Sequence, residues 1–317
     1  MKKISLLNKN HTIEITNIVI GELSAHMPER TKNAHWCYDA YLEYGGNCFD
    51  TARIYGGGKS EYALGDYLKG KPRDSFLIST KCGHHNSAKP PIGRLSPNEI
   101  TDEVEISLRA LGCGYIDILY LHRDDIFRDV SEIMPTLHKF VEEGKVRVLG
   151  ASNWTAARID EANKFANENG MTPFSVSQIH WNLGLTTAAR TGDLTHIVMD
   201  EAEMSWYSIN QFPVMAYTPT GRGYFAKILS NSPMNPSAMK YFGWLPENFE
   251  RAKRAEKLAK ELGVSVSAVV LSYVLSSHIP AMGITAFSSE QQFHETIQAA
   301  ELTLTAEHRA FLEGKKL

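Results

Sequence analysis

The apolar residues of the chain follow two alternating periods for most of its length. Short runs rich in β-branched and other apolar residues, typical of strands, alternate with longer stretches that have helical spacing. The predicted strands lie at 17–21, 47–50, 76–80, 116–121, 146–150, 174–178, 213–217 and 281–285. The predicted helices include 60–70, 96–112, 131–145, 155–170 and 246–260. An earlier pair of apolar runs, 4–7 and 12–16, predicts an N-terminal β-hairpin.

Strand followed by helix, repeated eight times, indicates a parallel α/β architecture. Two architectures fit this order, an open doubly wound sheet and a closed barrel of eight units. An open sheet normally carries a GxGxxG fingerprint after its first strand, but the chain reads GELSAHMPER after Ile20. We therefore expect one (β/α)8 TIM barrel domain over residues 1–317, with the N-terminal β-hairpin. We expect a long loop at 228–244.

Composition and charge narrow the classes of function. The 317 residues are 43% hydrophobic and 22% charged, which are globular proportions. The net charge is -3, without a block of like charges, so a nucleic-acid partner is disfavoured. No apolar run approaches the ~20 residues of a membrane span, and the start of the chain does not resemble a signal peptide. The 4 cysteines lack CxxC spacing, which favours free thiols in a reducing compartment, so we expect a cytoplasmic protein.

Polar residues follow several of the predicted strands. The chemistry of a barrel lies at the carboxyl ends of its strands, so these residues are expected to share one face. They are Asp50 with Tyr55 five positions on, Lys81, His122, the pair Ser152 and Asn153, and Gln178. Each alone is more often a loop cap, a packing residue or a solvated side chain. Together, a carboxylate, a tyrosine, a lysine and a histidine from successive strand ends can form a proton-transfer set.

The proposed chemistry of this set follows from the ordinary properties of its side chains. A free tyrosine has a pKa of about 10, too high for ready proton exchange near neutrality. Lys81 would favour the phenolate of Tyr55, and Asp50 would hold the ammonium in place. His122 offers a second hydrogen bond at the same position. Such a set suits delivery of a proton to a carbonyl oxygen while a nicotinamide hydride attacks the carbonyl carbon.

These residues lie in motifs that resemble the aldo-keto reductases along nearly the whole chain. The motifs are FDTARIYGGGKSEYALG, LISTKCG, SLRALGCGYIDILYLHRDD, EEGKVRVLGASNW, SQIHWN and AYTPTGRGYF. The resemblance implies a catalytic tetrad of Asp50, Tyr55, Lys81 and His122, with Tyr55 as the acid/base. It also implies NAD(P)H as the hydride donor and no metal.

The resemblance also implies a set of cofactor-binding residues. Ser152, Asn153 and Gln178 match the groups that bind the nicotinamide carboxamide, and Trp181 stands where the family usually has a tyrosine under the nicotinamide ring. An indole can also stack there. The matches to the pyrophosphate loop are Thr218, Thr220, Gly221 and Gly223, and those toward the adenosine are Ser288, Gln292, Glu295 and Thr296.

The residues after the eighth predicted strand bear on the choice of cofactor. Many family members clamp the 2′-phosphate of NADP with a Lys or Arg near the start of this loop and an Arg six residues later. Here residues 286–289 read AFSS and are followed by Gln292, which brings no charge. Charge-assisted hydrogen bonds are about twice as strong as neutral ones. On the basis of the cofactor that the family commonly uses, we expect NADP(H) to be slightly favoured over NAD(H).

The substrate is less well defined by the sequence. The segment Arg123-Asp124-Asp125 and the pair His84-His85 would suit a hydroxylated carbonyl compound such as a sugar, but a salt-bridged rim explains them equally well. A metal at Cys82 and His84 lacks a clear third ligand, so we expect none. The partner is expected to be a small carbonyl compound, with neither nucleic acid nor membrane. The sequence leaves the oligomeric state open.

Two other classes of function stay open at this point. Some relatives resemble reductases but serve as channel-associated or regulatory subunits, so a cofactor-sensing interaction subunit with slow or vestigial activity is one alternative. A metal-dependent barrel hydrolase or isomerase is the other. The latter needs converging His and carboxylate ligands, and the strand ends supply too few.

Overall fold

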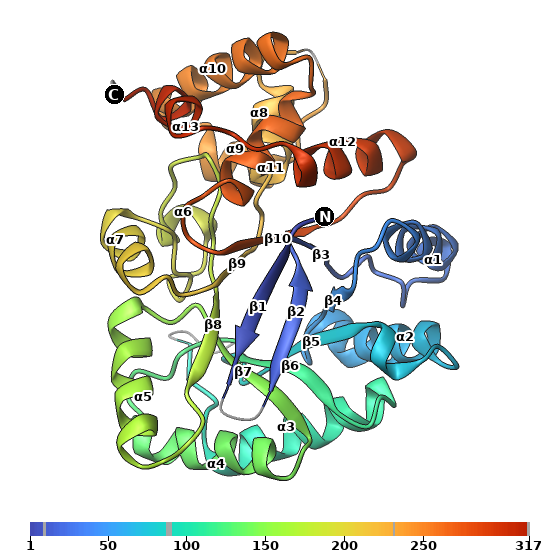
Figure 1. Cartoon of the computed structure of the whole chain (residues 1–317), viewed down its shortest axis with the longest axis vertical. Coiled ribbons are helices and arrows are strands. Elements are labelled where there is room, and N and C mark those ends of the chain that lie inside the picture. Colours follow the sequence, from blue (N-terminus) through green and yellow to red (C-terminus); the bar gives the residue numbers. More distant parts are fainter. Residues whose placement is uncertain (9–10, 87–90, 231, 316–317) are drawn as a thin grey trace. The chain divides into compact units, whose positions relative to one another are not determined.

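The computed structural model describes residues 1–8, 11–86, 91–230 and 232–315 (Figure 1). Two compact units divide the chain: Lys3–Gln178 forms one, and Met1–Lys2 with Ile179–Leu317 forms the other. The parallel strands follow the order of a closed barrel, β10-β3-β4-β5-β6-β7-β8-β9. The predicted fold, an eight-stranded α/β barrel preceded by a hairpin, is therefore confirmed. The expectation of one domain over the whole chain stays a prediction.

The Lys3–Gln178 unit begins with the hairpin and contains six strands of the barrel. The hairpin strands β1 (Lys3–Leu7) and β2 (Thr12–Thr16) pair antiparallel. The barrel strands are β3 (Ile18–Ile20), β4 (Cys48–Asp50), β5 (Leu77–Cys82), β6 (Ile116–Leu121), β7 (Val146–Ser152) and β8 (Phe174–Gln178). The helices are α1 (Pro28–Glu43), α2 (Lys59–Leu68), α3 (Pro97–Leu111), α4 (Val130–Glu142) and α5 (Ala156–Glu168). The six barrel strands contain almost only buried residues, as expected for parallel strands covered on both faces.

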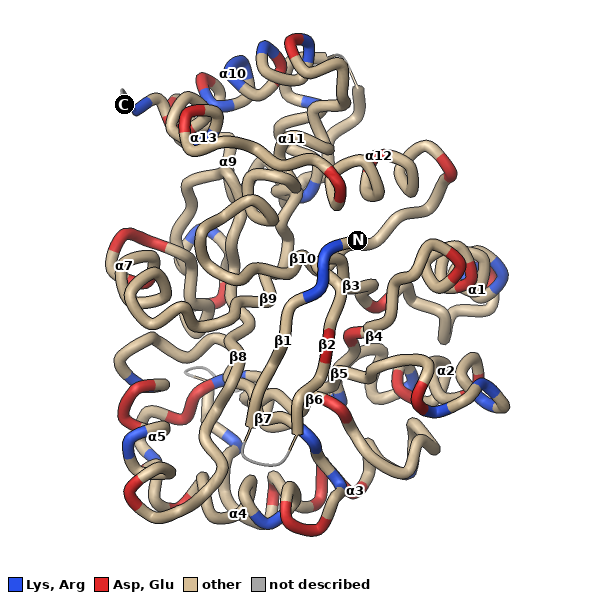
Figure 2. The backbone as a smooth tube through the Cα atoms, viewed as in Figure 1, with Lys and Arg blue, Asp and Glu red and all other residues tan. Residues whose placement is uncertain are grey.

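The second unit contains β9 (Val214–Ala216) and β10 (Ala281–Thr285), which pair in parallel. Its helices are α6 (Ala188–Thr191), α7 (Glu201–Asn210), α8 (Tyr224–Lys227), α9 (Pro236–Phe242), α10 (Pro246–Leu262), α11 (Val266–Leu275), α12 (Glu290–Glu301) and α13 (Ala306–Glu313). Figure 2 shows Lys and Arg alternating with Asp and Glu along α10, as is usual for an exposed helix face.

The expectation of a continuous loop at 228–244 is wrong in part, because α9 lies inside it. Asn235 caps this helix by accepting a hydrogen bond from the backbone N–H of Ser237, and Pro236 occupies its first turn. Tyr241 and Phe242 then bury their rings in the core of this unit. Burial of these aromatic rings stabilises a helix too short to form alone. Residue 231 lies outside the described residues.

No single helix among the described residues is long and apolar enough to cross a bilayer. In the part of the chain that the structure describes, one bent pair of helices, α10 with α11, has the length and composition of a span when the two are joined. The bend between these two helices is 99°.

Candidate active site

Asp50 and Lys81 meet because their strands are neighbours. β4 and β5 pair with Asp50 opposite Ser79, so Lys81, two residues further along β5, projects from the same face as Ser79. The Lys81 ammonium donates to Asp50 Oδ2 at 2.6 Å and to the backbone carbonyl of Thr51 at 2.7 Å. Lys81 is 1% and Asp50 4% exposed, so the ion pair lies out of water and depends on these hydrogen bonds.

The second oxygen of Asp50 is also occupied. Asp50 Oδ1 accepts from Ser79 Oγ at 2.7 Å and from Gln178 Nε2 at 3.0 Å. Burial acts to lower the pKa of Lys81, but Asp50 and Tyr55 outweigh it, and this pKa is raised above its ordinary value. The ammonium is therefore held charged beside Tyr55.

Tyr55 opens a tight 3-10 turn, Tyr55–Gly58, that leads into α2. The turn requires glycine, since Gly56, Gly57 and Gly58 have φ values of 58°, 63° and 92°. Lys81 Nζ lies 5.0 Å from the centroid of the Tyr55 ring, and the His122 ring lies 5.7 Å away, edge to face. Tyr55 is half-buried whereas Lys81 is almost completely buried, so Tyr55 is the more accessible of the two side chains.

His122 follows β6 directly and completes the predicted tetrad within one unit. Its backbone N–H donates to the carbonyl of Cys82 at 2.7 Å, which continues the pairing of β5 with β6. Its ring lies 4.7 Å from the ring of His84 at 83°. The structure thus brings Asp50, Tyr55, Lys81 and His122 together as the sequence predicted; their catalytic roles stay a prediction.

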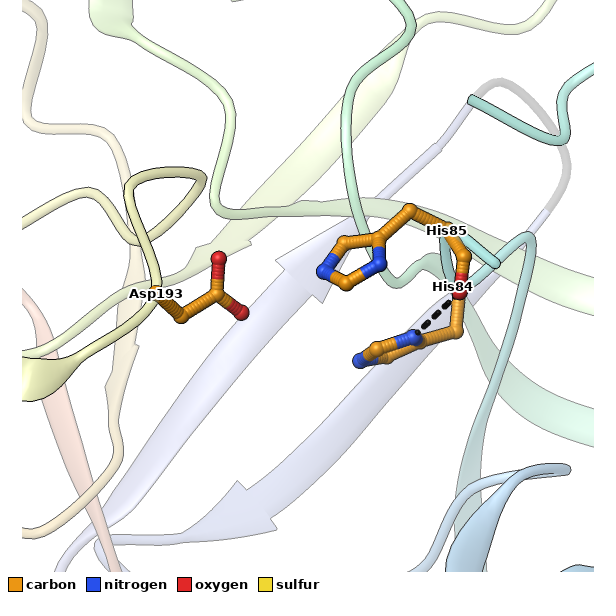
Figure 3. A group of neighbouring side chains, drawn as sticks. All are labelled: His84, His85 and Asp193. Atoms are coloured by element: carbon orange, nitrogen blue, oxygen red, sulfur yellow. Dashed lines mark hydrogen bonds between the residues drawn. The ribbon is translucent and has the colours of Figure 1, made fainter. Parts of the chain in front are cut away.

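His84 and His85 lie side by side (Figure 3), and His84 is the one in ring contact with His122. Their ring centroids are 4.4 Å apart, and His84 Nδ1 lies 2.9 Å from the backbone carbonyl oxygen of His85. Asp193, also drawn in Figure 3, belongs to the other unit. Burial, with Glu103 and Glu61, raises the pKa of the Cys82 thiol, which disfavours a thiolate ligand. The expectation that no metal takes part stays a prediction.

The three residues predicted to meet the nicotinamide carboxamide also come together. Ser152 at the end of β7 pairs with Gln178 at the end of β8. Asn153 adopts a left-handed conformation, φ 55°, from which its backbone N–H donates to the Gln178 carbonyl at 3.0 Å. Its side-chain amide lies 3.1 Å from Ser152 Oγ and 3.4 Å from the His122 carbonyl. Asparagine is one of the non-glycine residues that adopt this conformation most readily, and here the turn brings its side-chain amide beside Ser152 and His122.

The remaining predicted cofactor residues lie in the other unit. Trp181 is 2% exposed. Gly221, Arg222 and Gly223 are all left-handed, and the Gly221 N–H donates to the Thr218 carbonyl at 3.0 Å. The Gly223 N–H donates to the Thr220 carbonyl at 3.2 Å, so the predicted loop is a compact double turn. Thr218 is itself left-handed, φ 53°, and its buried hydroxyl makes no hydrogen bond with the described residues.

The predicted adenosine-side residues gather at the start of α12. The Ser288 hydroxyl and backbone N–H both donate to Gln292 Oε1, at 3.1 and 2.9 Å. Thr296 Oγ1 donates to the Gln292 carbonyl at 2.9 Å, and Glu295 accepts from Gln291 at 3.1 Å. A helix N-terminus favours an anion, but these side chains add no positive charge. A 2′-phosphate would meet dipoles and hydroxyls here rather than an ion pair.

The sequence reasoning missed several supporting residues. Ser79 and the Thr51 carbonyl complete the hydrogen bonding around Asp50 and Lys81. Ser79 precedes Lys81 by two residues, and the period of a strand could have revealed it. A second buried network lies on the opposite face of β5, where Thr80 donates to Glu61 at 2.7 Å and Arg53 forms an ion pair with Glu61. Nothing local in the sequence joins these three.

The polar segment after His122 forms ion pairs. Arg158 lies 3.4 Å from Asp124, and Arg128 lies 3.7 Å from Asp125. Burial raises the pKa of Asp124 to about 6 despite its arginine partner. These carboxylates are therefore engaged within the protein, which weakens their use as evidence for a hydroxylated substrate.

Comparison with known proteins shows to which family the chain belongs. Residues 19–315 match the sequence model of the Aldo/keto reductase family. A putative aryl-alcohol dehydrogenase of Saccharomyces cerevisiae is 30% identical over 98% of this chain and 86% of its own length. An aryl-alcohol dehydrogenase [NADP(+)] of Phanerodontia chrysosporium is 27% identical over 86% of this chain and 73% of its own length. A norsolorinic acid reductase of Aspergillus flavus is 28% identical over 85% of this chain and 68% of its own length.

The chain belongs to the aldo/keto reductase family. It is an oxidoreductase of the carbonyl and alcohol class that uses a nicotinamide cofactor. These relatives bear the names of enzymes, which give no support to the regulatory-subunit alternative. Family membership also argues against a metal-dependent hydrolase.

Proposed function

We propose that the protein reduces an aldehyde or ketone to the alcohol, with Tyr55 as the proton donor. The observation that carries this proposal is the buried Lys81 ammonium, held by Asp50 at 2.6 Å and lying 5.0 Å from the Tyr55 ring centroid. A sealed cation stabilises negative charge on the neighbouring phenol far better than an exposed one, because water does not screen it.

Each residue has a separate task in this reaction. The substrate carbonyl oxygen accepts hydrogen bonds from Tyr55 and His122, which orients it and polarises the carbonyl bond. Tyr55 gives up its proton as negative charge develops on that oxygen, and Lys81 stabilises the resulting phenolate. Asp50 keeps Lys81 in place and takes no proton. The bound cofactor supplies the hydride to the carbonyl carbon.

The residues present fit a nicotinamide dinucleotide. Ser152, Asn153 and Gln178 offer amide and hydroxyl groups for the carboxamide, and Trp181 offers an aromatic face for the ring. The buried, unpartnered hydroxyl of Thr218 and the start of α12 fit the phosphates. NADPH is proposed as slightly preferred over NADH, with support from the NADP(+) in the name of one relative.

Aromatic aldehydes are the first substrates to test, because several relatives are named aryl-alcohol dehydrogenases. Hydroxylated aldehydes are the second, and glyceraldehyde serves as their probe. The proposal also includes a cytoplasmic location and a small molecule as the partner.

The experiment follows the oxidation of NADPH and of NADH with benzaldehyde and with glyceraldehyde. Tyr55→Phe should lower kcat at least about a hundredfold, since one positioned acid contributes about 10²–10⁴-fold. Cofactor affinity, followed by quenching of tryptophan fluorescence, should stay within about twofold. Tyr62→Phe on the exposed side of α2 is the matched control and should keep full activity. Retained turnover in Tyr55→Phe would exclude Tyr55 as the acid.

A further inference from the structure

A large cavity lies within the unit Ile179–Leu317, and none of its lining residues belongs to the tetrad. Its volume is about 710 Å³, within the range of about 300–1,000 Å³ typical of small-molecule sites. The wall includes the start of α7 and residues of α10, α11 and α13. Met199, Met204 and Leu185 give it an apolar part.

Three polar side chains in this wall carry buried nitrogen atoms without a hydrogen-bond partner among the described residues. They are His180 Nε2, Arg251 Nε and Arg309 Nε. His180 is 3% and Arg251 9% exposed, so bulk water makes few hydrogen bonds with these side chains. A buried polar atom left unpaired costs about 1–3 kcal/mol, and native proteins keep few of them. The same wall therefore brings two guanidinium groups and an imidazole to one cavity.

The two arginines are only partly neutralised by the protein. Arg251 Nε makes no hydrogen bond with the described residues, but it lies 3.5 Å from Glu247 Oε1 in an ion pair. Arg251 Nη1 donates to the Leu183 carbonyl at 2.6 Å, and Arg254 also pairs with Glu247. Arg309 stacks on Tyr273, with 5.0 Å between its guanidinium carbon and the ring centroid. Arg309 Nη1 donates to the Ser276 carbonyl at 3.4 Å.

The acidic residues of the wall are largely committed elsewhere. Glu313 accepts from the Tyr273 hydroxyl at 2.7 Å and pairs with Lys315 at 2.6 Å. Asp200 caps α7 by accepting from the Glu203 N–H at 2.9 Å. Glu201 is exposed. Burial, together with His196 and Arg222, lowers the pKa of His180 to about 3, so His180 adds a neutral group and no charge.

We infer that this cavity binds a small organic carboxylate whose apolar body lies against the methionine side chains. Guanidinium groups pair with a carboxylate through charge-assisted hydrogen bonds, and Arg251 and Arg309 have nitrogen atoms left to donate. Trp181 also lines the cavity, so a ligand there would contact a residue of the proposed cofactor set.

Isothermal titration of the full chain with sodium benzoate tests the inference, with benzamide as the neutral analogue of the same shape. Benzoate should bind, and benzamide should bind at least about tenfold more weakly. Arg309→Gln should weaken benzoate binding at least about tenfold, because one hydrogen bond to a charged group is lost. Arg190→Gln, which changes an exposed arginine outside the wall, should bind benzoate as the unchanged protein does.

Two further variants keep the test independent of folding and of the proposed reductase site. Arg309→Lys keeps the charge without the guanidinium, and an intermediate affinity at an unchanged Tm supports the assignment. His122→Asn should leave benzoate binding intact. Loss of binding in His122→Asn, equal binding of benzamide, no effect of Arg309→Gln, or no binding of benzoate at all would each overturn the inference. None of these outcomes depends on turnover, so the proposed reductase function can fail or hold separately.

Discussion

Lys81 Nζ lies 2.6 Å from Asp50 Oδ2, and both side chains are almost completely buried. The two residues come from neighbouring strands, β5 and β4, whose register is set by their backbone pairing. A buried ion pair contributes little net stability when intact, but loss of one partner leaves an uncompensated charge. The pair therefore makes the site sensitive to single substitutions, in both folding and catalysis.

Asp50→Asn should strongly destabilise the protein. The variant leaves the Lys81 ammonium buried without its carboxylate, which costs about 3–5 kcal/mol in the free energy of unfolding. Urea denaturation at pH 7 measures this value, and turnover should fall as well. Glu250→Gln breaks the exposed pair with Lys253 and should cost less than about 1 kcal/mol. Equal effects of the two variants would contradict the structural role given to Asp50.

Gly58→Ala should disrupt the turn that carries Tyr55. Gly58 has φ 92°, and an added Cβ would lie 1.9 Å from Arg53 Nη2, which donates to the Gly58 carbonyl at 2.6 Å. Displacement of Arg53 also weakens its pair with the fully buried Glu61, so we expect a loss of about 2–4 kcal/mol. Gly57→Ala is the matched control.

Gly57 has φ 63°, and nothing lies within 4 Å of an added Cβ. Gly57→Ala should therefore cost only about 1–2 kcal/mol, the penalty for a left-handed residue. Thermal unfolding of both variants separates backbone strain from the steric conflict with Arg53. A Gly57→Ala variant as unstable as Gly58→Ala would argue against the Arg53 contact.

Asp124→Asn should change how stability depends on pH. The pKa of Asp124 is raised to about 6 in the folded protein, above its ordinary value near 4. Between pH 4 and pH 6 the folded state binds more protons than the unfolded state. The contribution of Asp124 to the free energy of unfolding is therefore complete below pH 4 and is lost as the pH rises through 6. Relative to the unchanged protein, the variant should gain about 1–3 kcal/mol between pH 4 and pH 7.

Urea denaturation of Asp124→Asn and of Asp102→Asn across this range measures the difference. Asp102 is exposed on α3, and its substitution should leave the pH dependence of the unchanged protein in place. If the free energy of unfolding depended on pH in the same way in Asp124→Asn as in Asp102→Asn, this result would contradict the buried state of Asp124.

Gln292→Arg should raise affinity for NADPH without a matching gain for NADH. The substitution adds a cation at the start of α12, where the side-chain Oε1 of Gln292 accepts hydrogen bonds from Ser288. A charge-assisted bond to a 2′-phosphate should strengthen NADPH binding about tenfold. Gln291→Arg is the control on the same turn, and fluorescence titration with each cofactor provides the measurement. An equal gain for both cofactors would place the 2′-phosphate elsewhere.

Much of the fold was predictable because strand and helix periods are local properties of the chain. The structure places β6, β8 and β10 at Ile116–Leu121, Phe174–Gln178 and Ala281–Thr285, the same bounds as the predicted runs. Helix α11 was not predicted, because its residues are apolar on nearly all sides and show no helical stripe. Helix α9 was not predicted because it depends on the burial of Tyr241 and Phe242.

The residue types and spacing of Asp50, Tyr55, Lys81 and His122 were readable along the chain, since each lies at or shortly after the carboxyl end of a strand in a parallel sheet. The hydrogen bonds that join these residues could not be read from the sequence. Gln178 reaches Asp50 across 128 residues of sequence, and Thr51 holds Lys81 through a backbone carbonyl that any residue would offer. The cavity around Arg251 and Arg309 is likewise a product of packing between distant helices. Periodicity encodes which face a residue takes, whereas contacts between remote segments depend on how those faces pack.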